Sequence, residues 1–281
     1  LASINPFFKR RMSLLKFLFI ILIVSCASNF NSRLRYNKTS DKVYKKIDPL
    51  LNTGVFISYG QSNSENCGEI GYYVVNEVFQ FFNDSTFVYS DPSLGGICRE
   101  SFEGGSVWGL VGDKLIEEKT FGQVVFSMNG WGGTTMKELG EGELYSYFKK
   151  NYFSLIENFG KVDGILFHQG ESNHKNLEGN DNYYEEFHKF YRRMNRDGIT
   201  AKFYLSKTSY CDEGRGYGID ENLLNIQDKI ITDFNNVFRG PNTDELISSK
   251  DRLQDQCHFS LFGYNKFAEL WVKAISDESE Y

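Results

Sequence analysis

The stretch Val55-Phe56-Ile57-Ser58-Tyr59, followed at once by Gly60-Gln61-Ser62-Asn63, decides the fold. The first five residues form an apolar run of strand length, and small polar residues follow it directly. Similar runs lie at about residues 86–89, 123–127, 162–167 and 201–205. Between them, apolar residues recur at helical spacing, at about residues 70–82, 107–115, 144–159, 183–194, 223–234 and 261–275. This alternation predicts an α/β fold, with an open, doubly wound parallel sheet that helices cover on both faces.

Composition and charge narrow the class of protein. The 281 residues are 41% hydrophobic, 16% aromatic and 24% charged, with a net charge of −6. This composition is that of a globular protein and excludes a disordered or collagen-like chain. Beyond the first residues the chain has no basic stripe, so we expect no nucleic-acid partner.

The N-terminal residues have the pattern of an export signal. Basic residues at 9–11 precede the apolar run 17–24, which is too short to span a bilayer as a helix. We therefore interpret residues 1–25 as a signal peptide, with 1–11 as a possible over-long gene start because Met12 follows them. Residues 26–50 are predicted to form a polar tether, and residues 51–281 the folded domain.

The end of this segment, Ile23-Val24-Ser25-Cys26, resembles the bacterial lipobox. The resemblance implies that Cys26 carries a lipid and becomes the mature N-terminus. We then expect an exported lipoprotein, in the periplasm or at the outer membrane or cell surface, that contacts the membrane only through this anchor. The alternative is a plain cleaved signal in which the cysteine is incidental.

Four other cysteines remain in the exported chain, and an even number suggests two disulfides. They are Cys67, Cys98, Cys211 and Cys257. Of the three possible pairings we favour Cys67–Cys98 with Cys211–Cys257; four buried free thiols are the alternative.

Polar residues collect where the predicted strands end, and parallel strands bring those ends to one edge of the sheet. The segments are 60–63, 129–134 and 168–173, with 255–258 just before the last helix. Acyl transfer needs a nucleophile such as Ser62, a base such as His258 and a carboxylate such as Asp255 to orient the base. Alone, Ser62 would be interpreted as a helix N-cap and His258 as a surface residue.

Five blocks in this order resemble the SGNH hydrolases, and more narrowly their sialate O-acetylesterase and carbohydrate esterase family 6 branch. The blocks are Gly60-Gln61-Ser62-Asn63, Asp91-Pro92 with Gly104-Gly105-Ser106-Val107-Trp108, Trp131-Gly132-Gly133-Thr134, His168-Gln169-Gly170-Glu171-Ser172-Asn173, and Asp255 with His258. The similarity covers about residues 53–275. It implies a three-layer α/β/α sandwich with a five-stranded parallel, flavodoxin-like sheet, the SGNH hydrolase fold.

The resemblance also implies roles for individual residues. Ser62 would be the nucleophile, His258 the base and Asp255 the residue that orients it. The oxyanion would be bound by the Ser62 amide, by the amide of Gly105 (or Gly104) and by the side chain of Gln169, with Asn63 and Glu171 as supporting residues. The chain departs from the usual pattern at Ser64-Glu65-Asn66-Cys67, where an apolar residue is often found, and this leaves the sugar open.

The sequence thus predicts a serine esterase that removes O-acetyl groups from carbohydrates through an acetyl-enzyme and needs no cofactor. The triple His168, Glu171 and His174 does not have the spacing of a helical zinc motif, so we expect no metal. Two alternatives remain: a non-catalytic carbohydrate-binding lipoprotein of the same fold, and a lipase or thioesterase for longer acyl chains.

Overall fold

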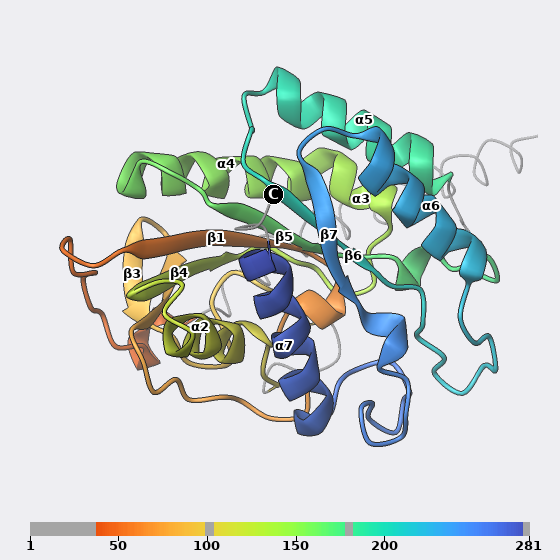
Figure 1. Ribbon diagram of the computed structural model, residues 1–281, viewed down its shortest axis with the longest axis horizontal. Coiled ribbons are helices and arrows are strands. Elements are labelled where there is room, and N and C mark those ends of the chain that lie inside the picture. Colours follow the sequence, from red (N-terminus) through yellow and green to blue (C-terminus); the bar gives the residue numbers. More distant parts are fainter. Residues whose placement is uncertain (1–37, 99–103, 178–181, 278–281) are drawn as a thin grey trace, which may run out of the picture. The chain divides into compact units, whose positions relative to one another are not determined.

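The structure of the protein is a computed structural model that describes residues 38–98, 104–177 and 182–277. Within these residues one sheet contains seven strands in the order β3-β2-β4-β1-β5-β6-β7 (Figure 1). All neighbouring strands are parallel except β2 and β3. The strands are β1 (Thr53–Gly60), β2 (Val78–Phe82), β3 (Ser85–Val88), β4 (Gln123–Met128), β5 (Gly164–His168), β6 (Phe203–Lys207) and β7 (Val237–Asn242).

Helices cover both faces of this sheet, as Figure 1 shows. Helices α2 (Trp108–Glu117) and α7 (Leu261–Ser276) contact each other on one face. The other face carries α3 (Met136–Gly140), α4 (Gly142–Phe159), α5 (Tyr183–Arg196) and α6 (Glu221–Asp233). The predicted three-layer α/β/α architecture is therefore confirmed.

Strand β1 shows why the sheet lies between two helical layers. Val55, Ile57 and Tyr59 point into the core beneath α4 and α5, whereas Phe56 points into the core beneath α2 and α7. All four side chains are at most 1% exposed. Because burial of each such side chain contributes about 2 kcal/mol, both faces of the strand stabilise the fold.

The sheet has two more strands than the five that were predicted. Residues 70–77 form no helix and residues 78–82 form strand β2, so the prediction of a helix over residues 70–82 is wrong. Asn83 and Asp84 both have positive φ angles, 47° and 57°, which reverse the chain in two residues and pair β2 antiparallel with β3. The seventh strand, β7, was missed because its residues Arg239, Gly240 and Pro241 interrupt the apolar run.

The described part of the segment 26–50 is bound to the domain. The backbone of Val43 and Lys45 pairs with Val88 and Thr86 at the free edge of β3, with N–O distances of 2.8 and 3.2 Å. The unit Leu1–Lys38, with the predicted signal peptide and the lipidation site Cys26, lies outside the described residues except for Lys38. No helix of the described residues combines the length and the apolar character that crossing a membrane requires.

The carboxyl ends of β1, β4 and β5 meet at Gly60. The amide of Gln61 donates to the carbonyl of His168 (3.0 Å), and the amide of Trp131 donates to the carbonyl of Gly60 (2.9 Å). Gly60 has a φ of 150°, and a Cβ atom there would lie 2.0 Å from the His168 carbonyl oxygen. Only glycine allows this approach, so the loops after three strands start side by side.

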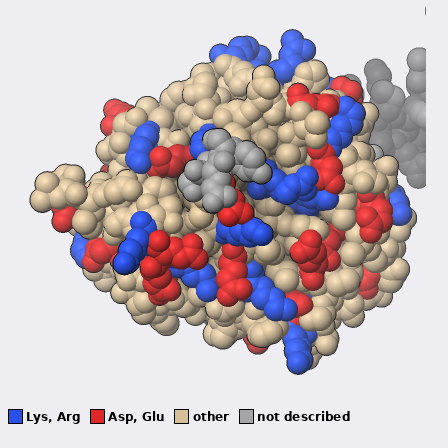
Figure 2. Space-filling view, viewed as in Figure 1, with Lys and Arg blue, Asp and Glu red and all other residues tan. Residues whose placement is uncertain are grey.

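Charges are mixed on the face seen in Figure 2, where acidic and basic side chains lie next to one another. On this face neither sign covers a continuous area.

Candidate active site

Ser62 begins a short 3-10 turn, η2 (Ser62–Ser64), directly after β1. The turn is closed by bonds from the Ser64 amide to the Gln61 carbonyl and from the Glu65 amide to the Ser62 carbonyl, both 3.0 Å. The indole of Trp108 donates to the Ser64 carbonyl at 2.7 Å. The Ser62 side chain therefore sits on a rigid turn, where it is 7% exposed.

Asp255 and His258 form a hydrogen-bonded pair on the loop before α7. His258 Nδ1 lies 2.6 Å from Asp255 Oδ2, while Asp255 Oδ1 accepts the amides of Cys257 (2.9 Å) and His258 (3.0 Å). Burial opposes ionisation of Asp255, but the bond from His258 and the two amides outweigh it and lower the pKa of Asp255 to about 2. The carboxylate is therefore ionised at neutral pH and fixes the orientation of the imidazole.

Ser62 and His258 line the same pocket, which has a volume of about 680 Å³. Gln61, Gly132, Gly133 and Glu171 also lie in its wall. The pocket thus joins the loops after β1, β4 and β5 to the loop before α7. The residues predicted as nucleophile and base thus line one pocket, although 196 positions separate them in the chain.

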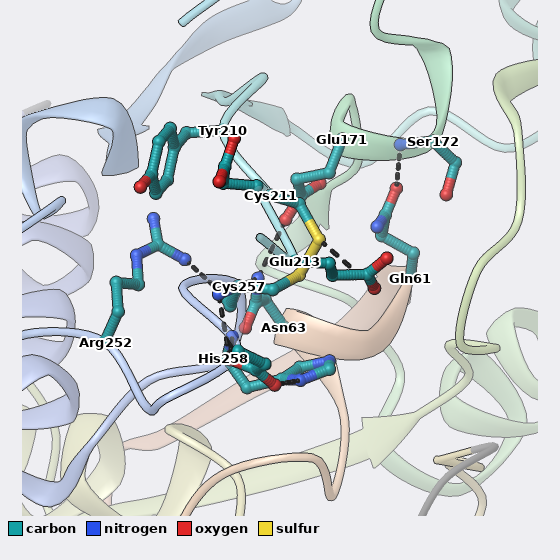
Figure 3. Close-up of a disulfide and its surroundings, with 12 residues drawn as sticks. Gln61, Asn63, Glu171, Ser172, Tyr210, Cys211, Glu213, Arg252, Cys257 and His258 are labelled. Atoms are coloured by element: carbon teal, nitrogen blue, oxygen red, sulfur yellow. Dashed lines mark hydrogen bonds and ion pairs between the residues drawn. A yellow bond between two sulfur atoms is a disulfide. The ribbon is translucent and has the colours of Figure 1, made fainter. Parts of the chain in front are cut away.

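Asn63 joins the Ser62 turn to the His258 loop. Its side-chain amide donates to Glu171 Oε1 at 2.9 Å and to the Cys257 carbonyl at 3.2 Å (Figure 3). Asn63 and Glu171 are both buried. Their position fits the supporting role that the resemblance implied.

Arg252, which the sequence did not single out, holds the His258 loop from inside. It is 3% exposed, and its guanidinium donates to the carbonyls of Leu246 (2.7 Å), Thr243 (2.9 Å) and Cys257 (2.5 Å). It also stacks on Phe259, 3.8 Å from the ring centroid. Burial lowers the pKa of Arg252 to about 10, which leaves it charged at neutral pH.

Both disulfides of the structure lie in the pocket wall. Cys67 is bonded to Cys98 and Cys211 to Cys257, with Cα–Cα distances of 5.3 and 4.1 Å. This is the pairing that we favoured from the sequence. Figure 3 shows that the second bond adjoins His258, and it ties the segment after β6 to the loop before α7. Glu213 lies close to both sulfur atoms, but because these are bonded to each other they are not thiolate ligands for a metal.

Two residues predicted to bind the oxyanion lie elsewhere. Gln169 is fully buried, and its amide nitrogen donates to the Thr134 carbonyl (3.0 Å) and to Asn173 Oδ1 (2.7 Å), which occupies both of its hydrogens. Gly105 precedes α2 and does not line the pocket. A Cβ atom on Gly105 would lie 2.1 Å from the Ile70 carbonyl, so close packing explains this glycine.

The loop after β4 supplies the glycines that line the pocket instead. The amide of Gly132 donates to the Ile97 carbonyl. Within the described residues the amides of Ser62 and Gly133 have no hydrogen-bond partner, and Gly133 has a φ of 67°. The sequence could have predicted the role of this loop, because the loop follows a strand that ends at the same sheet edge as Ser62. Gly105 does not follow such a strand.

Comparisons with known proteins identify the family of the chain. A family model described as "Carbohydrate esterase, sialic acid-specific acetylesterase" matches residues 52–275. The chain belongs to this family. It is a carboxylic ester hydrolase of the SGNH type. No curated protein sequence matches the chain.

Solved structures share the fold of this esterase at low identity. A protein from Arabidopsis thaliana is 15% identical, with a TM-score of 0.62 over 81% of this chain and 98% of its own. NanS is 14% identical, with a TM-score of 0.57 over 83% of this chain and 99% of NanS. A putative GDSL-like lipase from Parabacteroides merdae is 14% identical, with a TM-score of 0.51 over 82% and 99%.

Proposed function

We propose that the esterase removes O-acetyl groups from carbohydrates by means of Ser62, His258 and Asp255. The observation that carries this proposal is the 2.6 Å contact between His258 and an ionised Asp255 in the pocket that Ser62 lines. A serine hydroxyl becomes a competent nucleophile only when a nearby base takes its proton. The family supports an acetyl ester as the substrate.

In the first half-reaction Ser62 Oγ attacks the acetyl carbonyl, and His258 Nε2 takes its proton. Asp255 accepts a hydrogen bond from the Nδ1–H group of His258, remains ionised, and stabilises the imidazolium that forms. His258 then returns the proton to the sugar oxygen, which leaves as an alcohol while the acetyl group stays on Ser62. Water, activated by the same imidazole, releases acetate and restores the hydroxyl.

The oxyanion of each tetrahedral intermediate is bound by the amides of Ser62 and Gly133. Both belong to loops that start side by side at Gly60, and neither is used elsewhere in the described structure. The loss of one such donor slows an acyl-transfer enzyme about 10²- to 10³-fold.

The sugar occupies the outer part of the pocket. The exposed Glu213 and Arg215 and the half-buried Tyr217 line the pocket together with the disulfide at Cys257. Arg215 pairs with Glu213 at 2.9 Å and lies over the ring of Tyr217 at 5.1 Å. A wall of polar groups and one aromatic ring suits the hydroxyls and apolar face of a sugar better than an acyl chain.

The experiment measures acetate released from acetylated xylan, O-acetylated sialic acids and acetylated simple sugars, with p-nitrophenyl esters of increasing chain length beside them. We expect release from at least one glycan and a fall in kcat/KM beyond acetate. A flat or rising profile beyond butyrate would identify a lipase or thioesterase instead. Tight glycan binding with no acetate release would identify a non-catalytic binding protein.

We further propose that the enzyme is exported and held at a membrane by a lipid on Cys26. Two disulfides support export, because such bonds persist in oxidising compartments. The Cys26→Ser variant should leave the membrane fraction and appear in the soluble fraction. Unchanged partitioning would rule out the anchor.

A further inference from the structure

Glu65 is a completely buried acid next to the Ser62 turn. Its side chain is 0% exposed, and its amide closes the turn on the Ser62 carbonyl. Oε1 accepts the amide of Gly130 at 2.5 Å and lies 3.5 Å from the Ser58 hydroxyl. Oε2 has no hydrogen-bond partner, and the described part of the chain brings no Lys or Arg to the carboxyl group. A carboxylate would be costly in such a place.

The surrounding backbone is shaped to contain this carboxyl group. A Cβ atom on Gly96 would lie 1.4 Å from Glu65 Oε2, and one on Gly130 would lie 2.2 Å from Oε1. Both positions must therefore be glycine for the side chain to fit. No other role for Gly96 or Gly130 is needed to explain the absence of a side chain there.

The same carboxyl group reaches the loop that carries Gly133. The amide of Ile97 donates to the Gly130 carbonyl (3.2 Å), and the amide of Gly132 donates to the Ile97 carbonyl (3.0 Å). Glu65, Ile97 and the loop after β4 thus form one hydrogen-bonded layer. One end of this layer is the Ser62 turn and the other is Gly133.

We propose that Glu65 is a positioning residue, a neutral carboxylic acid that fixes the Gly130–Gly133 loop against the Ser62 turn so that the amides of Ser62 and Gly133 converge on one oxyanion. This inference rests on the proposed function. Glu65 does not touch the substrate. It acts through the 2.5 Å bond to Gly130, which fixes the position of the Gly130–Gly133 loop relative to Ser62.

The electrostatic surroundings agree with a neutral acid. Burial raises the pKa of Glu65 well above its usual value, and the nearby amides of Gly130 and Asn129 and hydroxyls of Ser58 and Ser64 offset this only in part. The titratable groups that face it are Tyr147 of α4 and Tyr264 of α7, whose pKa values burial also raises. None of these groups supplies a positive charge that would stabilise a carboxylate.

The test compares Glu65→Gln with Glu65→Leu. Glutamine keeps an acceptor for the Gly130 amide and stays neutral, so we expect kcat within about threefold of wild type. Leucine removes the acceptor, and we expect kcat to fall about 10- to 100-fold while KM changes less than about twofold, because the oxyanion forms only in the transition state. The ratio of the kcat values of wild type and Glu65→Gln should stay constant from about pH 6 to about pH 8.

Asp113→Asn is the matched control for a purely structural carboxyl group. Asp113 is buried and accepts the Tyr72 hydroxyl and two backbone amides near the start of β2, away from the pocket. The Asp113→Asn substitution should lower the thermal midpoint and leave kcat unchanged. Glu65→Leu protein that melts cooperatively but keeps wild-type kcat would overturn the proposal.

Two further outcomes would also overturn it. If Glu65→Gln loses as much activity as Glu65→Leu, a carboxyl proton or charge is required and not merely an acceptor. If the ratio of kcat values changes about tenfold over this pH range, Glu65 is not neutral throughout. A failure of the proposed function itself is distinguishable, because Ser62→Ala would then retain activity.

Discussion

The Ser62 turn and the His258 loop hold their reactive groups by different means. Ser62 follows a central strand directly, and its turn continues the hydrogen bonds of the sheet through Gly60 and Gln61. His258 lies on a long connection between β7 and α7, outside the strands of the sheet, where an antiparallel bridge between Arg252 and Phe259 pairs the loop only with itself. There the loop is held by Arg252, by the Cys211–Cys257 bond and by the Asp255 carboxylate.

This difference teaches that a sheet positions only the residues that leave it directly. A catalytic group placed farther along the chain needs its own cross-links, because a free loop samples many conformations. We therefore expect the His258 loop to be sensitive to loss of individual cross-links, and the Ser62 turn to be insensitive to loss of its neighbouring disulfide.

Removal of the reactive group itself should have the largest effect. Ser62→Ala takes away the nucleophile and leaves the anchors of both regions intact, so we expect kcat for an aryl acetate to fall about 10⁶-fold. The thermal midpoint should stay within about 2 °C of wild type. Hydrolysis at more than about a tenth of the wild-type rate would remove Ser62 from the mechanism.

The second effect concerns orientation of the imidazole. Asp255→Asn keeps an oxygen for the two backbone amides but no longer stabilises the imidazolium, and we expect kcat to fall about 10⁴-fold at neutral pH. The matched control, Asp251→Asn, changes a buried carboxylate of the same loop that pairs with Ser248 and Lys266. If both variants lose activity equally, general loosening of the loop explains the loss.

The pH dependence of stability follows from the same pair. Folding lowers the pKa of Asp255 from 3.8 to about 2, so its contribution to stability is complete above about pH 4. This contribution is lost as the pH falls towards about 2, where the folded protein also takes up the proton. Asp255→Asn should therefore reduce the difference in thermal midpoint between about pH 5 and about pH 3.

Arg252 should have a smaller but clear effect on activity. Arg252→Lys cannot donate to three carbonyls in one plane, so we expect a loss of about 3 kcal/mol of stability and a 10- to 100-fold fall in kcat. Arg239→Lys is the control, because Arg239 pairs with Asp228 on the exposed side of β7. It should change stability by less than about 0.5 kcal/mol. Equal effects of the two substitutions would show that Arg252 does not hold the loop.

Removal of the disulfides should change kcat least. It also tests the comparison most directly, because one disulfide lies beside the Ser62 turn and the other beside the His258 loop. Replacing Cys211 and Cys257 with serine opens a link between positions 46 residues apart, which should cost about 2–4 kcal/mol and lower kcat about 3- to 10-fold. Replacing Cys67 and Cys98 should also lower stability but leave kcat near wild type, because β1 still holds Ser62. A larger fall in kcat on replacing Cys67 and Cys98 than on replacing Cys211 and Cys257 would reverse the comparison.

The sequence predicted the parts of the molecule that local patterns determine. The sequence showed most of the apolar strands and the helices α4, α5 and α7. It also showed the spacing of Asp255 and His258. Strand β2 was missed because a run such as Val78–Phe82 satisfies helical and strand patterns alike, and the turn at Asn83 and Asp84 decides between them.

Some features of the site could not be predicted, because they depend on contacts between distant segments. The sequence does not show that the Gln169 amide is already used by Thr134 and Asn173. Arg252 reads as a surface charge beside Lys250 and Asp251, and only the fold places it beneath the loop. The buried environment of Glu65 likewise depends on two glycines, 31 and 65 residues away.

The most direct measurement identifies the residue that carries the acyl group. The enzyme is inactivated with an alkyl fluorophosphonate, digested and mapped by mass spectrometry. The expected result is one adduct on the peptide that contains Ser62, formed in proportion to lost activity and strongly slowed in His258→Ala. An adduct on another residue, or full inactivation with Ser62 unmodified, would contradict the assignment of Ser62 as the nucleophile.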